Sequence, residues 1–169
     1  RLLTPEIYGV FAIVLVYLYL LEMFSDFGVR SLILTKEGDV EDDFLRTCWT
    51  MMILRGMVIA LLSLGIAGSI GMFQGQGVFA ADSPYAATVL PLAIAALGGT
   101  VFIIGFQSPM AYMSERNMDF GRVTWVAIIT NIVGLIATIV LAFYLRSIWA
   151  LVLGNFAKAI TQVILSFWL

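Results

Sequence analysis

The chain has 169 residues, of which 62% are hydrophobic and 12% are Asp, Glu, Lys or Arg. Soluble domains carry about 45–50% apolar and about 25% charged residues, so this composition excludes an ordinary soluble domain and predicts an integral membrane protein. The net charge of −2 excludes the basic surface that nucleic-acid binding requires, and the absence of histidine excludes His-dependent catalysis and most zinc chemistry.

The first apolar stretch covers about residues 8–34, which is long enough for a membrane-spanning helix, since a span needs about 20 apolar residues. Glu22, Asp26 and Arg30 interrupt it at intervals of four residues, which places the three side chains on one face of a helix. Charged groups at membrane depth are costly and usually face a bundle interior or a wet cavity. We therefore expect this face to point away from lipid.

The second apolar stretch, about residues 48–73, is interrupted by Arg55. At a rise of 1.5 Å per residue, Asp26 and Arg55 each lie roughly 12 Å inside their helices from the same side of the membrane. If the two helices are antiparallel neighbours, the two charges meet, and we predict an ion pair. Charge reversal at Arg55, rescued by a reciprocal change at Asp26, tests this pair.

Other interpretations of these charges stay open. The pair of Asp26 and Arg55 is also compatible with a purely structural role that fixes the register of two helices. Arg30 is near enough to the end of its helix to reach the polar interface with its long side chain. Glu22 would then be the acid that faces a cavity.

Three further apolar stretches follow, at about residues 85–112, 123–145 and 147–169. We expect Gln107-Ser108-Pro109 to disturb the last turns of the first of these, because proline breaks the helical hydrogen-bond pattern. Lys158 lies at the centre of the last stretch, too deep to reach either interface. We expect it to face a cavity or to couple to an ion, although a structural partner would also explain it. The fold class is therefore an all-α, polytopic transmembrane helix bundle with five spans.

Small residues at helical spacing predict close contacts between helices. One such set lies in the second stretch and another in the fourth: Gly65, Gly68 and Gly71, and Thr130, Gly134 and Thr138. The chain begins at Arg1 and ends inside an apolar run, so we expect it to be part of a longer membrane protein.

Lys and Arg residues predict the orientation, because cytoplasmic loops carry an excess of them. One side of the membrane holds four such residues with Arg30 close by, whereas the other side holds Arg1 and Arg146; the four are Lys36, Arg46, Arg116 and Arg122. We therefore expect loops 35–47 and 115–122 to be cytoplasmic.

The sequence contains no recognisable constellation of catalytic residues and no cluster of metal ligands, so we expect neither an enzyme nor a bound cofactor or metal. Glu22 and Asp26 are four residues apart on one helix. This arrangement suits a cation or proton relay better than acid–base attack on a bond.

Several short segments, in their order and spacing, resemble the Wzx-type polysaccharide flippases, which belong to a superfamily that also contains multidrug exporters. The segments are Arg1-Leu2-Leu3-Thr4-Pro5-Glu6-Ile7-Tyr8-Gly9, Ser25-Asp26-Phe27-Gly28-Val29, Phe44-Leu45-Arg46-Thr47-Cys48-Trp49, Leu54-Arg55-Gly56, Met118-Asp119-Phe120-Gly121-Arg122 and Trp149-Ala150-Leu151-Val152-Leu153-Gly154. The resemblance covers nearly the whole chain.

The resemblance implies a two-lobed transporter of about twelve to fourteen helices, of which this chain is about helices two to six of the N-terminal lobe. It implies movement of undecaprenyl-pyrophosphate-linked oligosaccharide across the bacterial inner membrane by alternating access. The expected partners are this lipid-linked oligosaccharide, membrane lipid, H⁺ or Na⁺ as coupling ion, and polysaccharide polymerase machinery. Arg30, Arg55 and Lys158 would attract the pyrophosphate, and Glu22 and Asp26 would couple to the ion.

Three alternatives remain at this stage. A cation-coupled multidrug exporter of the same superfamily would have a large apolar cavity with few charges. A membrane-embedded glycan polymerase or ligase would need large outer loops with catalytic residues. In a structural multi-span subunit, the buried charges would all be used in contacts between helices.

Overall fold

The computed structural model describes residues 5–24, 28–36, 41–76 and 87–168. Each secondary-structure element in this part of the chain is a helix. The helices are α1 (Pro5–Phe24), α2 (Val29–Thr35), α3 (Asp42–Gly75), α4 (Val89–Ile104), α5 (Met110–Arg116), α6 (Phe120–Leu145) and α7 (Ile148–Ser166).

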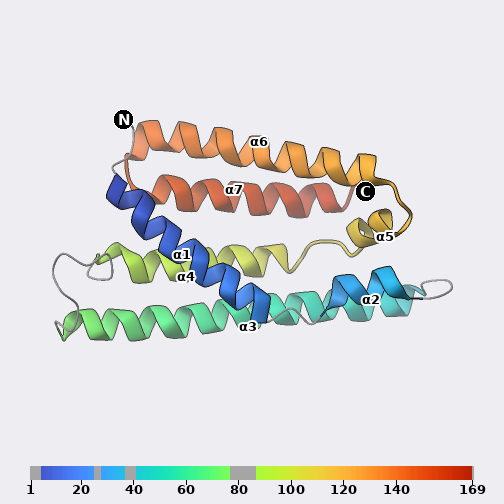
Figure 1. Cartoon of the computed structure of the whole chain (residues 1–169), viewed down its shortest axis with the longest axis horizontal. Helices are drawn as coiled ribbons and strands as arrows, with labels where there is room; N and C mark the ends of the chain where they lie inside the picture. The colour runs from blue at the N-terminus through green and yellow to red at the C-terminus, as the bar shows by residue number, and fades with distance from the viewer. Residues whose placement is uncertain (1–4, 25–27, 37–40, 77–86, 169) are drawn as a thin grey trace.

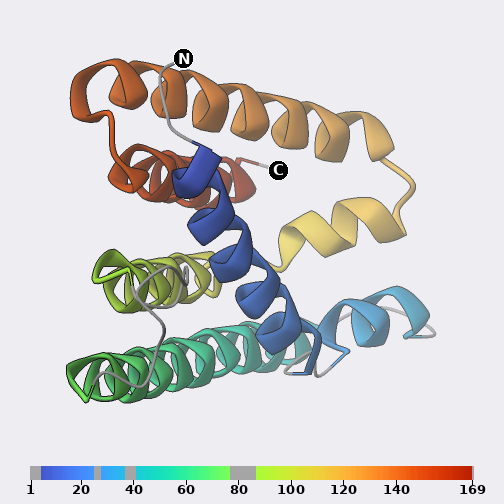
Figure 2. The ribbon, with the colours of Figure 1, turned by 60° about the vertical axis from the view of Figure 1, so that its left-hand side comes forward.

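Four long helices lie side by side in the order α6, α7, α4, α3 (Figure 1). Helix α1 crosses this layer obliquely and contacts α4 and α7 (Figure 2). An apolar core fills the space between α1 and the layer, with Val14 and Leu18 from α1, Leu97 from α4 and Val152 from α7. The two short helices, α2 and α5, contact each other at one end of the layer.

Three of the described helices, α3, α6 and α7, are long and apolar enough to cross a membrane. The apolar stretch of α1, Tyr8–Leu20, and helix α4 are shorter. Large apolar side chains such as Leu135 and Ile136 on α6 are more than half exposed, which is costly in water but favourable against lipid tails. The protein is thus an all-helical, polytopic membrane bundle, as the composition predicts.

The first expected helix, over residues 8–34, is two helices in the structure, because α1 ends at Phe24 and α2 begins at Val29. Gly28 precedes α2 with a φ of 65°, a left-handed conformation that glycine adopts without the steric cost of a side chain. The predicted pair of Asp26 and Arg55 assumed that the whole first segment lies beside the helix that carries Arg55. The first segment divides its contacts, since α1 packs against α4 and α7 whereas α2 contacts α3 and α5.

The third expected helix, over residues 85–112, is interrupted where the sequence predicts a disturbance. Helix α4 ends at Ile104, and α5 starts at Met110, immediately after Pro109. Backbone groups in the interruption bond to neighbouring helices. The Ser108 N–H donates to the Ser166 hydroxyl of α7 (2.9 Å), and the Phe106 carbonyl accepts from the Trp49 indole of α3 (3.3 Å). The break is therefore stabilised by tertiary hydrogen bonds that replace helical ones.

Small residues mediate close helix contacts at some of the predicted positions. In α6, Gly134 lies against Lys158, and Thr138 lies against Gly154 of α7, so the prediction is confirmed for these two residues of the set. The prediction for the second stretch is wrong within the described residues, because no atom of another helix lies within 4 Å of a Cβ built on its three glycines, Gly65, Gly68 and Gly71.

Helices α3 and α4 instead meet through small residues that the sequence analysis did not select. A Cβ on Gly56 would lie 3.1 Å from the Val101 carbonyl oxygen, and one on Gly105 would lie 3.0 Å from the Met52 carbonyl oxygen. Gly98 faces Ser63 in the same contact. Helix α3 therefore packs against α4 through Gly56 and Ser63 rather than through the three glycines that the sequence analysis selected.

The end of the bundle that carries α2 and α5 also contains the start of α3 and the start of α6 (Figure 1). The Arg116 guanidinium donates to the Lys36 carbonyl at the end of α2 (3.0 Å), and the Lys36 ammonium lies 3.8 Å from the centre of the Phe44 ring. These contacts connect α5, α2 and α3. The four basic residues assigned to one side of the membrane belong to this end.

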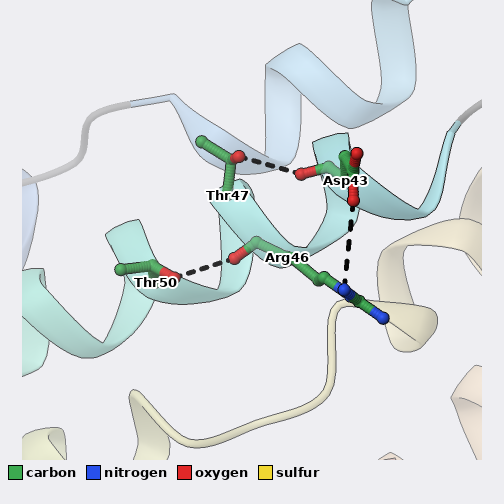
Figure 3. Close-up of polar contacts among 4 residues, drawn as sticks. All are labelled: Asp43, Arg46, Thr47 and Thr50. Carbon is green, nitrogen blue, oxygen red and sulfur yellow. Dashed lines mark hydrogen bonds and ion pairs between the residues drawn. The ribbon is translucent and has the colours of Figure 1, made fainter.

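Polar, exposed side chains occupy part of the first turns of α3 (Figure 3). The Thr47 and Thr50 hydroxyls donate to the Asp43 and Arg46 carbonyls (2.8 and 2.9 Å), and Arg46 Nη1 lies 4.0 Å from Asp43 Oδ1. Both charged side chains are at least 80% exposed, so this ion pair contributes little to stability. Its composition fits the aqueous end of a membrane helix.

Candidate functional site

Three neighbouring cavities lie around α7 and share lining residues. The first, of about 350 Å³, lies between α5, α6 and α7. Polar side chains make up much of its lining: Gln107, Tyr112, Glu115, Thr130, Asn131, Lys158 and Gln162. Polar groups in a membrane bundle usually face the bundle interior or a wet cavity, and this lining follows that pattern.

The second cavity, of about 280 Å³, lies where α3 and α4 approach each other, and Arg55 is in its lining. It shares Gln107, Tyr112 and Gln162 with the first cavity. The third, of about 180 Å³, lies between α1, α4 and α7, and it shares Lys158 and Gln162 with the first. The three spaces therefore form one polar region, with α7 at its centre.

Lys158 lies near the middle of α7 and lines two of the cavities. Its aliphatic part lies on Gly134 of α6, because a Cβ there would come within 3.0 Å of the lysine Cβ and 3.6 Å of its Cδ. Among the residues that the structure describes, Lys158 makes no ion pair or hydrogen bond. An ammonium held at a cavity wall in this way attracts an anion.

Arg55 is half-buried on α3, next to Gly56, where α3 and α4 are in close contact. The structure brings it to a cavity that adjoins the one lined by Lys158. Two cations from helices far apart in the sequence thus line one polar region. Whether they bind cargo stays a prediction at this point.

The structure does not describe the side chains of the other sequence-predicted site residues. Asp26 falls between α1 and α2, in the undescribed residues 25–27, so the predicted pair with Arg55 stays a prediction. Glu22 belongs to α1 and Arg30 to α2, but their side chains are not among those described. Their proposed roles also stay predictions.

The sequence analysis missed the neutral polar residues of the site. Gln162 and Gln107 are 55 residues apart, and their side-chain amides form a 3.0 Å hydrogen bond in which Gln162 is the donor. A signal for one side of this contact is present in the sequence. Asn155, Lys158, Gln162 and Ser166 recur at helical spacing, which predicts a polar face along α7.

The site combines two cations with amide and hydroxyl groups and one acid, Glu115. Such a lining complements a ligand that is anionic at one point and rich in hydroxyl groups elsewhere. Within the described residues, no group of three His, Cys, Asp or Glu side chains is placed to hold a metal ion.

An all-helical bundle with long apolar helices and polar cavities between them defines a polytopic membrane protein. A family model described as "polysaccharide biosynthesis protein" matches residues 1–169, and the chain belongs to this family. The match confirms the family resemblance seen in the sequence. The comparisons found no matching curated protein and no matching solved structure.

Proposed function

We propose that this chain is part of the N-terminal lobe of a flippase that moves undecaprenyl-pyrophosphate-linked oligosaccharide across the bacterial inner membrane. The protein acts as a transporter rather than a catalyst. Its headgroup cargo passes through the polar region around α7 by alternating access, while the lipid tail stays in the bilayer. H⁺ or Na⁺ is the proposed coupling ion.

The observation that carries this proposal is the placement of Arg55 and Lys158 in adjoining cavities that share three polar residues. The pyrophosphate of this cargo, bonded to the lipid at one end and to the sugar at the other, is a dianion near neutral pH, and two cations from different helices complement it. The family match supports a role in polysaccharide biosynthesis, and a lipid-linked pyrophosphate is the cargo that we propose for this site.

The same observations disfavour the alternatives. A multidrug exporter fits a large apolar cavity with few charges, whereas two basic residues and several amides line these cavities. A structural subunit fits a bundle in which every buried charge pairs with another helix, whereas Lys158 makes no such pair with the described residues. A glycan polymerase or ligase requires catalytic residues on large outer loops, and the sequence supplies no such loop.

The orientation belongs to the same proposal. The basic end of the bundle, which includes loops 35–47 and 115–122, faces the cytoplasm. Glu22 and Asp26 take part in ion coupling, Arg30 lies near the cytoplasmic entrance, and the partner on the outer side is polysaccharide polymerase machinery.

The test uses the full-length protein in a flippase-null strain. Arg55→Ala and Lys158→Ala each lower surface polysaccharide about tenfold or more, because a lost charge-assisted hydrogen bond costs roughly 1.5–3 kcal/mol. The lipid-linked repeat unit accumulates inside the cell at the same time. Arg55→Lys and Lys158→Arg retain part of the activity.

The matched control is Arg46→Ala, which removes an exposed cation from the same bundle. Immunoblots of the membrane fraction confirm equal amounts of each variant. Loss of surface polysaccharide without accumulation of the lipid-linked unit would contradict translocation, since the defect would then precede export.

A further inference from the structure

The side-chain amides of Gln107 and Gln162 are hydrogen-bonded to each other in the shared lining of the cavities around α7. Gln162 lines all three cavities. Gln107 lines the first cavity, which contains Lys158, and the second, which contains Arg55. Their mutual hydrogen bond, 3.0 Å long, joins α7 to the interruption after α4. The cavity that contains Lys158 and the cavity that contains Arg55 therefore share this neutral polar pair.

This amide pair keeps unused hydrogen-bonding capacity. A glutamine side chain offers two N–H donors and a carbonyl oxygen with two lone pairs. The contact between the pair uses one donor of Gln162 and one lone pair of Gln107. The remaining donors and acceptors complement hydroxyl groups, which both donate and accept, better than they complement a phosphate, which only accepts.

Thr130 on α6 adds a hydroxyl to the wall of the first cavity. Thr130 is 3% exposed, and within the described part of the chain its hydroxyl has no hydrogen-bond partner. Thr138 and Thr161, also on membrane helices, each donate to the carbonyl four residues earlier. A buried hydroxyl without a partner is unfavourable, so an occupant of the cavity that pairs with it is favoured.

We propose that Gln107, Gln162 and Thr130 form a neutral subsite for the sugar that is bonded directly to the phosphate of the cargo. Lys158 and Gln162 are one helical turn apart on α7, a rise of roughly 6 Å. A phosphate held at Lys158 thus brings its attached sugar to the amide pair. The inference rests on the proposed function of the same cavities and divides them into an anion subsite and a sugar subsite.

The experiment measures binding to the purified full-length protein in nanodiscs with two probes. One probe is undecaprenyl pyrophosphate without sugar, and the other is the lipid-linked repeat unit extracted from the flippase-null host. Gln107→Leu, Gln162→Leu and Thr130→Val each weaken binding of the sugar-bearing probe, with about a tenfold effect for the glutamines, because hydrogen bonds to the sugar are lost. Binding of the bare lipid pyrophosphate changes by less than about twofold.

Ser166→Ala is the matched structural control. It removes the hydrogen bond from the Ser108 N–H at the same interruption, but Ser166 lines none of the three cavities. Both affinities stay unchanged in this variant. If Ser166→Ala weakens the sugar-bearing probe as the glutamine variants do, the amide pair is structural and the inference is wrong.

The outcomes separate this inference from the proposed function. If the wild-type protein binds neither probe, the proposed function fails. If it binds both and the glutamine variants weaken them equally, only the sugar subsite fails. Should a glutamine variant not fold, Thr130→Val gives the same comparison, since it replaces a hydroxyl that has no described partner with a methyl group of similar size.

Discussion

The aliphatic part of Lys158 on α7 lies directly on Gly134 of α6, at a point where a Cβ on the glycine would come within 3.0 Å of the lysine Cβ. This contact fixes where the stem of the lysine runs and hence where its ammonium enters the cavity. The absence of a side chain at Gly134 is therefore a requirement for the position of the cation.

Gly134→Val is expected to lower surface polysaccharide, because the added side chain displaces Lys158, and overpacking of this kind costs about 1–3 kcal/mol. Gly134→Ala has a smaller effect in the same direction. Polysaccharide is measured in the flippase-null strain that carries the full-length variants. In a Lys158→Ala background, Gly134→Ala has little further effect if the glycine acts through the lysine.

The control for this prediction is Gly68→Val on α3. No atom of another described element lies within 4 Å of a Cβ at Gly68, so activity is retained. Equal losses in the two variants would show that any enlarged glycine impairs the protein, and the contact with Lys158 would then explain nothing.

The contact between Ser63 on α3 and Gly98 on α4 predicts a rescue. Gly98→Ala is expected to destabilise the bundle by about 1–3 kcal/mol, since the new methyl group overlaps the Ser63 side chain. Adding Ser63→Gly removes the overlapping atoms and restores part of the stability. Thermal unfolding of the full-length protein in detergent measures both effects, and simple additivity of the two substitutions would contradict the contact.

The proposed orientation predicts which loops a membrane-impermeant thiol reagent reaches. Asn117 and Arg146 are both exposed, at the connections from α5 to α6 and from α6 to α7, respectively. In a Cys48→Ala background, Arg146→Cys is labelled in intact spheroplasts, whereas Asn117→Cys is labelled only after lysis. The reverse pattern would place the basic end of the bundle outside the cell.

The sequence predicted those features that depend on the chain's local composition. Hydropathy located the apolar helices that became α3, α6 and α7, because burial in lipid requires a long apolar run. Pro109 marked the interruption between α4 and α5, because proline has no N–H and clashes with the preceding turn. Gly28, by contrast, did not predict the end of a helix, so the sequence analysis missed the break before α2.

Contacts between helices were predicted less well. Two glycine-containing sets looked equivalent in the sequence, yet Gly134 packs against a neighbour while Gly65 does not. Spacing shows that small residues share a face of a helix, but it does not show which face meets another helix. The same limit explains why the α3–α4 contact through Gly98 was not foreseen.

By itself, then, the sequence determined that this protein is a helical membrane bundle and that Arg55 and Lys158 interrupt its apolar stretches, since in lipid only a helix satisfies the backbone groups of a long apolar run. Only the tertiary structure decided that these cations line adjoining cavities and that Gln107 and Gln162 form a hydrogen bond in the lining that the two cavities share. Residues 55 positions apart come together through the packing of whole helices, and a helix's own periodicity carries no information about its partner.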